Sequence, residues 1–349
     1  MTTAVVSDLH LGSRYSLVAR REVRNRLVAE LRRADRVVLL GDLLSLRDAP
    51  AREVLETARP FLDELGRGDD APRIVVVPGN HDHRLARELL EGHSGPLALE
   101  QVAEPGDPKT GAVLCEAGVA VAYPGLWIRP DIYATHGHYL DCHLTFPRPE
   151  SLLAGVMSRV VGRPGAEATP DAYEAAVAPL YAFAYARAQR RGAPVVANGN
   201  SGPGRAILAE AWGQLDNGRR RSARRVAAKV AFGGAVGALN LAGLGPLRAD
   251  MSARELERAG VAAMAEVAVR LGVDSGHVIF GHTHRAGPMA GESWRLPAGG
   301  TLVNPGSWVR TDELIGDAGG RSPFWPGRCV MVEETGQPRL HDVLEGPAA

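Results

Sequence analysis

The first part of the chain alternates short apolar runs with longer stretches rich in Arg and Leu. The apolar runs are rich in β-branched residues and occupy 4–7, 37–40 and 74–77. Runs of this length and composition are typical of buried strands, whereas the apolar spacing between them is typical of helices. This alternation predicts an α/β sheet with helices covering its faces.

Further short apolar runs follow, and Gly or Pro bounds several of them. They occupy 112–115, 119–123, 132–135, 277–280, 301–304 and 329–333. Short runs bounded by turn residues are typical of strands. Together with the first three runs, they favour an arrangement of two packed sheets.

Residues 145–273 are rich in Ala and Arg, poor in strand signals and interrupted by Gly and Pro. This composition predicts a helical insertion that forms a cap. One helix is expected to begin after Pro170, because Asp171 and Glu174 suit the positive N-terminal end of a helix. Other helices are expected at 205–215, 219–241 and 252–271. The predicted domains are a first core segment at 1–144, the cap at 145–273 and a second core segment at 274–349.

The charge balance of the chain gives no strong nucleic-acid signal. Lys and Arg together number 40, as do Asp and Glu, and aromatic residues make up only 5% of the chain. A protein that tracks nucleic acid needs a positive surface and stacking side chains. The three cysteines are odd in number and widely spaced, which argues against a disulfide framework. Together with an N-terminus that lacks a leader-like segment, they predict a cytoplasmic protein.

Side chains that bind metals follow several of the predicted strands. The positions are Asp8, His10, Asp42, Asn80, His81, Asp82, His136, His138, His282 and His284. In open α/β sheets, active sites gather where loops leave the carboxyl ends of the strands. A mixture of carboxylate, imidazole and amide groups favours ions such as Mn²⁺, Fe²⁺ or Zn²⁺ over Ca²⁺, whose ligands are all oxygen. The sequence therefore predicts a transition-metal site at one edge of the sheet.

Five motifs in this order resemble those of the calcineurin-like metallophosphoesterase superfamily. They are Asp8-Leu9-His10, Gly41-Asp42, Gly79-Asn80-His81-Asp82, His136 within Thr-His-Gly-His, and Gly281-His282-Thr283-His284. Each motif alone is weak, but the ordered set is specific. The resemblance covers roughly 1–142 and 277–333 and leaves out the helical insertion.

The resemblance implies a four-layer α/β sandwich, with two mixed sheets flanked by helices, and a site for two divalent ions. Asp8, His10, Asp42 and His284 are then expected to hold one ion, and Asp42, Asn80, His136 and His282 the other. Mn²⁺ is the first expectation, with Fe²⁺ or Fe³⁺, Zn²⁺ and Mg²⁺ as alternatives. A hydroxide that bridges the two ions attacks phosphorus in such a site. The resemblance further implies that His81 protonates the leaving oxygen and that Asp82 orients His81.

Several residues near these motifs have two interpretations. His138, Asp141 and His143 are as compatible with orienting the metal-binding imidazoles as with a packed or solvent-exposed role. Arg14 suits a substrate phosphate, but it suits the solvated surface at least as well. The turn that begins at Asn304 is interpreted as structural.

Six cations between 219 and 229 precede an uncharged segment at 230–247. A single membrane crossing is excluded, because His136 and His282 lie on either side of this segment and must meet at one site. Three interpretations stay open: a buried contact between helices, a surface for docking on a membrane, and an apolar wall for a lipid-like substrate. Peripheral contact of 219–247 with the inner face of the membrane is therefore one expectation, and the oligomeric state is not predicted.

A helical cap before the last motif resembles the bacterial UDP-2,3-diacylglucosamine pyrophosphohydrolase branch, which cleaves a nucleotide-lipid diphosphate at the membrane surface. That branch has Arg where this chain has His81, so its leaving-group chemistry does not carry over. The predicted reaction is hydrolysis of a phosphodiester or diphosphate bond in a nucleotide- or lipid-linked substrate.

Other functions of the same superfamily provide the alternatives. They are a protein phosphatase, a cyclic-nucleotide phosphodiesterase and a nuclease, and outside enzymes a non-catalytic scaffold. The low aromatic content and the balanced charge disfavour the nuclease. The scaffold is disfavoured because every proposed ligand position is filled.

Overall fold

The computed structural model describes residues 1–105, 110–144, 165, 168–190, 253–297 and 299–344. Ten strands are described in this part of the chain. They are β1 (Thr3–Val6), β2 (Arg36–Leu39), β3 (Arg73–Val76), β4 (Glu100–Ala103), β5 (Val119–Arg129), β6 (Ile132–Thr135), β7 (His277–Phe280), β8 (Thr301–Val303), β9 (Arg328–Val332) and β10 (Arg339–Asp342).

Helices and short 3₁₀ turns connect these strands. The α-helices are α1 (Arg21–Leu31), α2 (Ala51–Leu65), α3 (Arg87–Gly92), α4 (Thr110–Glu116), α6 (Pro170–Arg190), α9 (Ala253–Arg270) and α10 (Asp312–Ile315). The 3₁₀ turns are η1 (Leu17–Ala19), η2 (His83–Ala86), η3 (His138–Cys142) and η5 (Gly316–Arg321).

The strands form one hydrogen-bonded path in the order β10-β9-β1-β2-β3-β5-β6-β7-β8, and β4 pairs with β5. Strands β1, β2, β3 and β5 are parallel, as are β6, β7 and β8, whereas β5 and β6 are antiparallel. The long strand β5 takes part in two ladders, because its first part pairs with β3 and its second part pairs with β6. The α/β class with a mixed sheet is therefore confirmed, but the two groups of parallel strands are joined through β5.

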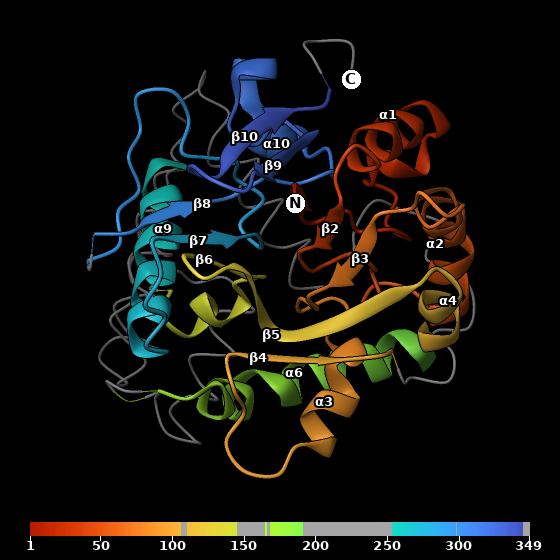
Figure 1. Ribbon diagram of the computed structural model, residues 1–349, viewed down its shortest axis with the longest axis horizontal. Coiled ribbons are helices and arrows are strands. Elements are labelled where there is room, and N and C mark those ends of the chain that lie inside the picture. The colour runs from red at the N-terminus through yellow and green to blue at the C-terminus, as the bar shows by residue number, and fades with distance from the viewer. Residues whose placement is uncertain (106–109, 145–164, 166–167, 191–252, 298, 345–349) are drawn as a thin grey trace, which may run out of the picture.

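Three apolar clusters hold helices and strands together. Leu31 and Phe61 of α1 and α2 pack with Val37 of β2, and Met264 of α9 packs with Phe280 of β7. Figure 1 shows these helices on opposite sides of the strands, with α1 and α2 on one side and α9 on the other.

The third apolar cluster contains side chains from both groups of parallel strands. Val5 and Val38 from β1 and β2 belong to it together with Ile279 from β7. The two groups therefore share a buried apolar layer, in addition to the layers that each shares with its own helices.

One predicted strand is wrong. Residues 112–115 lie in α4, and Val113 and Leu114 are the buried residues of this run. A four-residue apolar run does not distinguish a strand from one buried side of a short helix. The less apolar strands β4 and β10 were missed, since neither burial pattern contains a fully buried residue.

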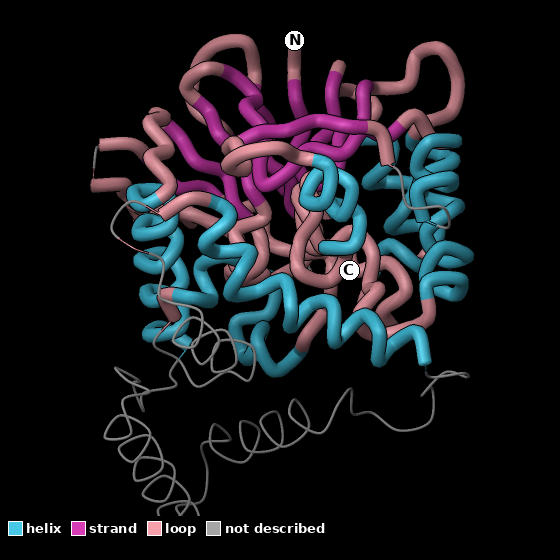
Figure 2. Tube along the Cα trace, turned by 90° about the horizontal axis from the view of Figure 1, so that it is seen from below, coloured by secondary structure: helices cyan, strands magenta, loops and turns pink. Residues whose placement is uncertain are grey.

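Two of the helices predicted in the insertion are confirmed. α6 begins at Pro170 and ends at Arg190, and α9 spans Ala253–Arg270. The helices predicted at 205–215 and 219–241 lie outside the described residues, as does the apolar segment 230–247. Figure 2 shows the strands gathered together, with helices on both flanks and along the opposite side of the molecule.

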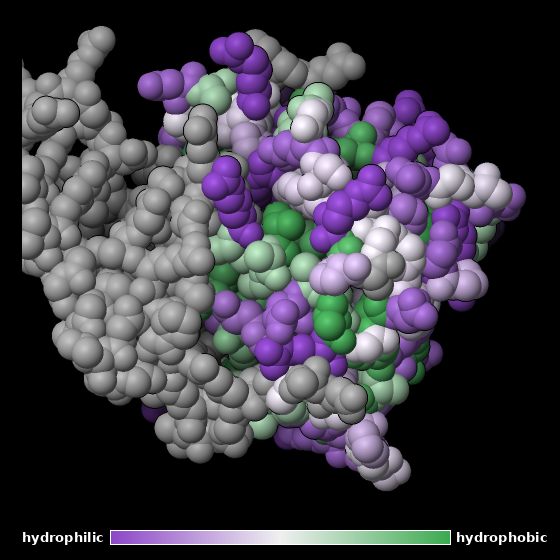
Figure 3. All heavy atoms as spheres, turned by 90° about the vertical axis from the view of Figure 1, so that its left-hand side faces the viewer, coloured by the Kyte–Doolittle hydropathy of each residue, from purple (hydrophilic) through white to green (hydrophobic). Residues whose placement is uncertain are grey.

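Among the described helices, none is both long and apolar enough to span a bilayer. The described surface shown in Figure 3 mixes hydrophilic and hydrophobic side chains. Such a mixture is usual for protein surfaces, more than half of which is apolar.

Candidate metal centre

The predicted ligands follow the carboxyl ends of five strands. Asp8, Asp42 and Asn80 come after β1, β2 and β3, which are neighbouring parallel strands. His136 comes after β6, and the pair His282 and His284 comes after its parallel neighbour β7. Loops that leave the same ends of parallel strands meet at one edge of a sheet. Within each group of parallel strands, the candidate ligands therefore lie at the same edge of the sheet.

The first set of ligands, the Asp8 cluster, consists of Asp8, His10, Asp42 and His284. The Nε2 atom of His284 lies 3.3 Å from Asp8 Oδ1 and 3.1 Å from the Nε2 atom of His10. The same His10 nitrogen lies 3.6 Å from Asp42 Oδ2. Two carboxylates and two imidazoles therefore converge on one small volume.

The second set, the Asn80 cluster, consists of Asp42, Asn80, His136 and His282. The side-chain oxygen of Asn80 lies 3.0 Å from His282 Nδ1 and 3.3 Å from His136 Nε2. His136 Nε2 also lies 3.5 Å from Asp42 Oδ1. Asp42 Oδ2 thus faces His10 and also lies 3.2 Å from the Asn80 amide, whereas Oδ1 faces His136, so that one carboxylate reaches both clusters.

The backbone at the ligands is strained. Non-glycine residues rarely adopt positive φ angles, and strain of this kind gathers at functional sites. Within the described residues, the non-glycine positions with positive φ are all candidate ligands: Asp8, His10, Asp42, His282 and His284. Their turns direct successive side chains into the same volume.

Glycines beside the ligands leave room for them. A Cβ atom on Gly79 would overlap Asp42 Oδ1, and one on Gly41 would overlap the ring of His136. A Cβ atom on Gly281 would overlap the hydroxyl of Ser7. Only glycine permits this close approach of backbone to side chain.

The polar atoms of the two clusters fit divalent cations. Asp8 Oδ1 is buried and has no hydrogen-bond partner. The Asn80 oxygen faces two acceptors, Asp42 Oδ2 and His282 Nδ1, and lies beside His136 Nε2. Buried acceptors that face one another are stabilised by a cation between them. The nitrogen and oxygen donors suit Mn²⁺, Fe²⁺ or Zn²⁺.

Burial and neighbouring charges shift the pKa values of these groups. Burial raises the pKa of Asp8, but the adjacent His284 outweighs it and lowers this pKa to about 2. Burial, together with His81, lowers the pKa of His10 to about 3, so its imidazole is neutral and able to bind a metal. Burial lowers the pKa of His136, but Asp42 outweighs it and raises this pKa to about 10. A metal at the Asn80 cluster must therefore displace a proton from His136.

Asp82 and His81 have different surroundings from those expected. The buried carboxylate of Asp82 accepts hydrogen bonds from the backbone N–H groups of Gly79, at 2.7 Å, and Leu44, at 3.1 Å. Burial and the nearby Asp42 raise the pKa of Asp82 to about 6. Asp82 thus ties together two ligand loops, and its role in orienting His81 stays a prediction.

His81 lies at the rim between the two clusters. Its backbone N–H donates to Asp42 Oδ1 at 2.8 Å, and its ring meets that of His10 edge-on at 4.7 Å. Its Nδ1 atom lies 3.2 Å from Asp48 Oδ2. The carboxylate beside His81 is therefore that of Asp48, which the sequence motif did not identify.

Two residues near the motifs contact the loop that carries His282. Asp141 Oδ2 lies 3.1 Å from His282 Nε2, on the side of the ring opposite to the nitrogen that faces Asn80. Asn304 donates to the carbonyl oxygen of Gly281 at 2.9 Å, so its turn also supports the loop of His282. The orienting interpretation of Asp141 therefore agrees with its position.

The other residues with two interpretations point elsewhere. His143 Nε2 lies 2.8 Å from Tyr173 Oη, and His138 Nε2 lies 3.2 Å from Tyr123 Oη. Arg14 is exposed, and its guanidinium packs against the ring of Tyr15 at 4.5 Å.

A polar cluster beneath α6, the Glu174 cluster, was not predicted as a unit. The buried Glu174 carboxylate accepts hydrogen bonds from the hydroxyls of Tyr123 and Tyr139 and lies 2.8 Å from His83 Nε2. Burial raises the pKa of Glu174, but His83 and the hydroxyl donors outweigh it and hold this pKa below its ordinary value. The start of α6, within the predicted insertion, is therefore fastened to the core.

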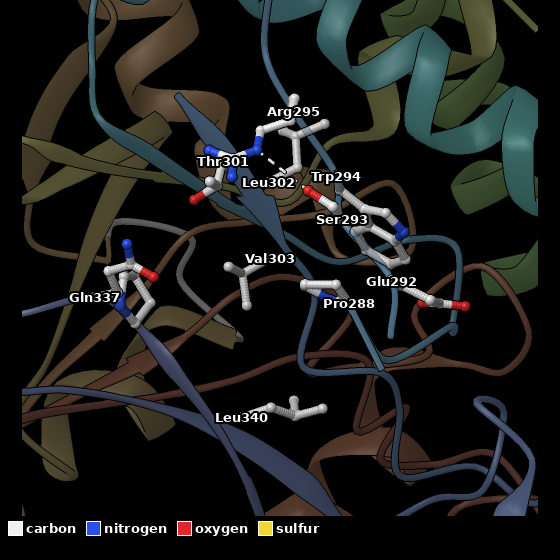
Figure 4. A pocket seen from close by; sticks show the side chains of 11 residues that line it. Pro288, Glu292, Ser293, Trp294, Arg295, Thr301, Leu302, Val303, Gln337 and Leu340 are labelled. Carbon is white, nitrogen blue, oxygen red and sulfur yellow. Dashed lines mark hydrogen bonds between the residues drawn. The ribbon is translucent and has the colours of Figure 1, made fainter. Parts of the chain in front are cut away.

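A cavity of about 260 Å³ lies between β8 and β10, which are the two end strands of the sheet path. Trp294, Leu302, Val303 and Leu340 are among its lining residues (Figure 4). None of the candidate metal ligands lines it, so this cavity is separate from the two clusters.

The fold and the clusters define the general class as a metal-binding α/β protein. Residues 1–174 match the family described as calcineurin-like phosphoesterase. The chain therefore belongs to the calcineurin-like phosphoesterase family, whose members are metal-dependent phosphoester hydrolases.

The family match contains the first five ligand positions, whereas His282 and His284 lie beyond it and reach the site through the fold. It also extends past the domain boundary predicted at 144, as far as Glu174. No curated protein matches the chain.

Proposed function

We propose that this protein hydrolyses phosphodiester or diphosphate bonds with two divalent ions, one in the Asp8 cluster and one in the Asn80 cluster. The position of the Asp42 carboxylate is the main support for this proposal. Its Oδ2 lies 3.6 Å from His10 Nε2, and its Oδ1 lies 3.5 Å from His136 Nε2. A carboxylate shared in this way is typical of a bridging ligand in two-metal sites. Mn²⁺ is the ion we expect first.

The chemistry divides between the bound ions and the chain. A pair of divalent ions lowers the pKa of water and neutralises the phosphoryl oxygens. The protein holds the ligands in place through strained turns and through the backbone hydrogen bonds to Asp82. His81, which lies beside both clusters and within 3.2 Å of Asp48, is proposed to hold the proton that the leaving oxygen takes up.

The proposal also includes a four-layer sandwich and a helical cap. The apolar layer shared by the two parallel strand groups supports a four-layer sandwich. The family match up to Glu174 and the packing of Glu174 into the core suggest that the cap begins later than residue 144.

The substrate is proposed to be linked to a nucleotide or a lipid. A protein phosphatase, a cyclic-nucleotide phosphodiesterase, a nuclease and a scaffold are the alternatives. Peripheral membrane contact through 219–247 stays a prediction, because that segment lies outside the described residues. A cytoplasmic location also stays a prediction.

Hydrolysis of three model substrates tests the proposal. Metal-free protein is resupplied with Mn²⁺ and given bis-p-nitrophenyl phosphate, p-nitrophenyl phosphate or a nucleotide diphosphate ester. We expect turnover of the first or third substrate that is lost on chelation and restored by Mn²⁺. Preference for the monoester would favour a phosphatase, and absence of metal binding would contradict the proposal.

A further inference from the structure

Arg47 lies beside the Asn80 cluster, five residues after Asp42 in the same loop. Its Nη1 atom is 2.6 Å from the end of the Asn80 side-chain amide. The guanidinium lies over the ring of Tyr181 in α6 at 5.4 Å, and its buried Nε atom has no hydrogen-bond partner. A cation with an unused donor therefore borders the candidate metal centre.

The amide of Asn80 has two orientations, and each satisfies different neighbours. With its oxygen toward His136 and His282, Asn80 suits a metal ion, but its NH₂ group then faces Arg47 Nη1, which is also a donor. In the opposite orientation the oxygen accepts from Arg47, while the NH₂ group donates to Asp42 Oδ2 at 3.2 Å and to His282 Nδ1 at 3.0 Å. Arg47 and the imidazoles face opposite ends of this amide, so its oxygen serves only one of the two sides at a time.

A metal ion at the Asn80 cluster therefore deprives Arg47 of its acceptor. The guanidinium then has two unsatisfied donors, Nε and Nη1, at the edge of a site that binds phosphate esters. The positive charge and the planar N–H donors of the guanidinium suit the oxygens of a phosphoryl group. The surrounding chain keeps Arg47 near the rim, because Gln189 of α6 accepts from the backbone N–H of Ala51 at 2.9 Å and fixes the same loop.

We propose that Arg47 binds an anionic oxygen of the substrate phosphoryl group and becomes available for it when a metal ion captures the Asn80 oxygen. This inference rests on the proposed function. Metal binding and anion binding are then cooperative, since the metal ion releases Arg47 from Asn80 and Arg47 binds the anion.

Binding of inorganic phosphate to Mn²⁺-saturated protein tests the inference without turnover. We expect Arg47→Gln to weaken phosphate binding about tenfold or more, because it removes charge-assisted hydrogen bonds. Arg47→Lys should restore part of the affinity, since it keeps the charge but not the planar set of N–H donors. Arg14→Gln is the matched control, because Arg14 is exposed and packs on Tyr15, and it should leave phosphate affinity unchanged.

Titration with Mn²⁺ gives a second readout. Arg47→Gln should bind Mn²⁺ as tightly as the wild type or several-fold more tightly, because the Asn80 oxygen has lost a competing charged donor. Phosphate affinity within twofold of the wild type in Arg47→Gln would overturn the inference. Failure of the wild type to bind Mn²⁺ would instead defeat the proposed function, so the two failures are distinguishable.

Discussion

The metal centre and the Glu174 cluster are both buried and polar, but they satisfy their polar groups in different ways. The Glu174 carboxylate has Tyr123, Tyr139 and His83 as partners. In the metal centre, Asp8 Oδ1 has no hydrogen-bond partner, and the imidazole nitrogens of His10 and His284 face each other at 3.1 Å. A buried polar cluster that is complete stabilises a fold, whereas one that lacks partners indicates a ligand.

The backbone conformation also differs between the Glu174 cluster and the metal centre. The residues of the Glu174 cluster lie in a strand, an α-helix and two 3₁₀ turns, and none of them has a positive φ angle. Asp8, His10 and Asp42 in the metal centre all do. In the described part of the chain, non-glycine residues with positive φ angles therefore occur only in the region that we assign to metal binding. The following substitutions test this contrast through Mn²⁺ affinity, in order of decreasing effect.

Asp42→Asn should have the largest effect. It removes the charge that spans both clusters, so we expect Mn²⁺ affinity to fall by more than about 100-fold, beyond the loss typical of residues that only support ligands. Calorimetric titration with Mn²⁺ measures this affinity. Asp63→Asn, an exposed position in α2, is the control and should bind as the wild type does. Tight binding by Asp42→Asn would show that the shared carboxylate is not a ligand.

Gly79→Ala should weaken Mn²⁺ binding next most strongly. The new Cβ would overlap Asp42 Oδ1, and a displacement of about 1 Å can cost on the order of 100-fold in function. Gly276→Ala is the control, because its Cβ would meet its nearest neighbour at an ordinary 3.4 Å. The same titration compares the two variants. Equal affinities would mean that the close approach at Gly79 does not shape the site.

Asp141→Asn should have a smaller effect on the Asn80 cluster. Removing the carboxylate that lies 3.1 Å from His282 Nε2 should weaken one Mn²⁺ site about 10-fold to 100-fold and leave the other nearly unchanged. Site-resolved titration separates the two affinities. A uniform loss at both sites would indicate general destabilisation instead of an orienting role.

Glu174→Gln should leave Mn²⁺ affinity within about twofold, because this carboxylate already has its partners within the protein. It should lower the free energy of unfolding at pH 7 by about 1 to 3 kcal/mol, since it weakens a buried charge-assisted network. Urea unfolding of metal-free protein measures the loss. A large drop in Mn²⁺ affinity without a loss of stability would contradict the proposed difference between the metal centre and the Glu174 cluster.

The stability loss in Glu174→Gln should also depend on pH. The folded-state pKa of Glu174 lies below its ordinary value of 4.5, so the charged form stabilises the fold. This contribution is present above about pH 4.5 and is lost as the pH falls through the folded-state pKa. The difference between the wild type and Glu174→Gln should therefore narrow in acid, and a constant difference would contradict the account.

The sequence predicted that the candidate ligands would lie together, because each of them follows an apolar strand within a few residues. Asp8 and Asp42 illustrate this, since parallel strands must bring their carboxyl ends to one edge. It did not predict Asp48 beside His81 or Arg47 beside Asn80, because these contacts depend on how separate loops pack. It also predicted a strand where α4 lies, since four apolar residues carry too short a pattern to separate the two structures.

The number of Mn²⁺ ions bound per chain tests the central claim most directly. Equilibrium dialysis followed by metal analysis measures this number for the wild type and for Asp42→Asn. We predict two ions per chain in the wild type and a loss of both in Asp42→Asn, because one carboxylate serves both clusters. A wild-type protein that binds no ion, or only one under saturating Mn²⁺, would contradict the account.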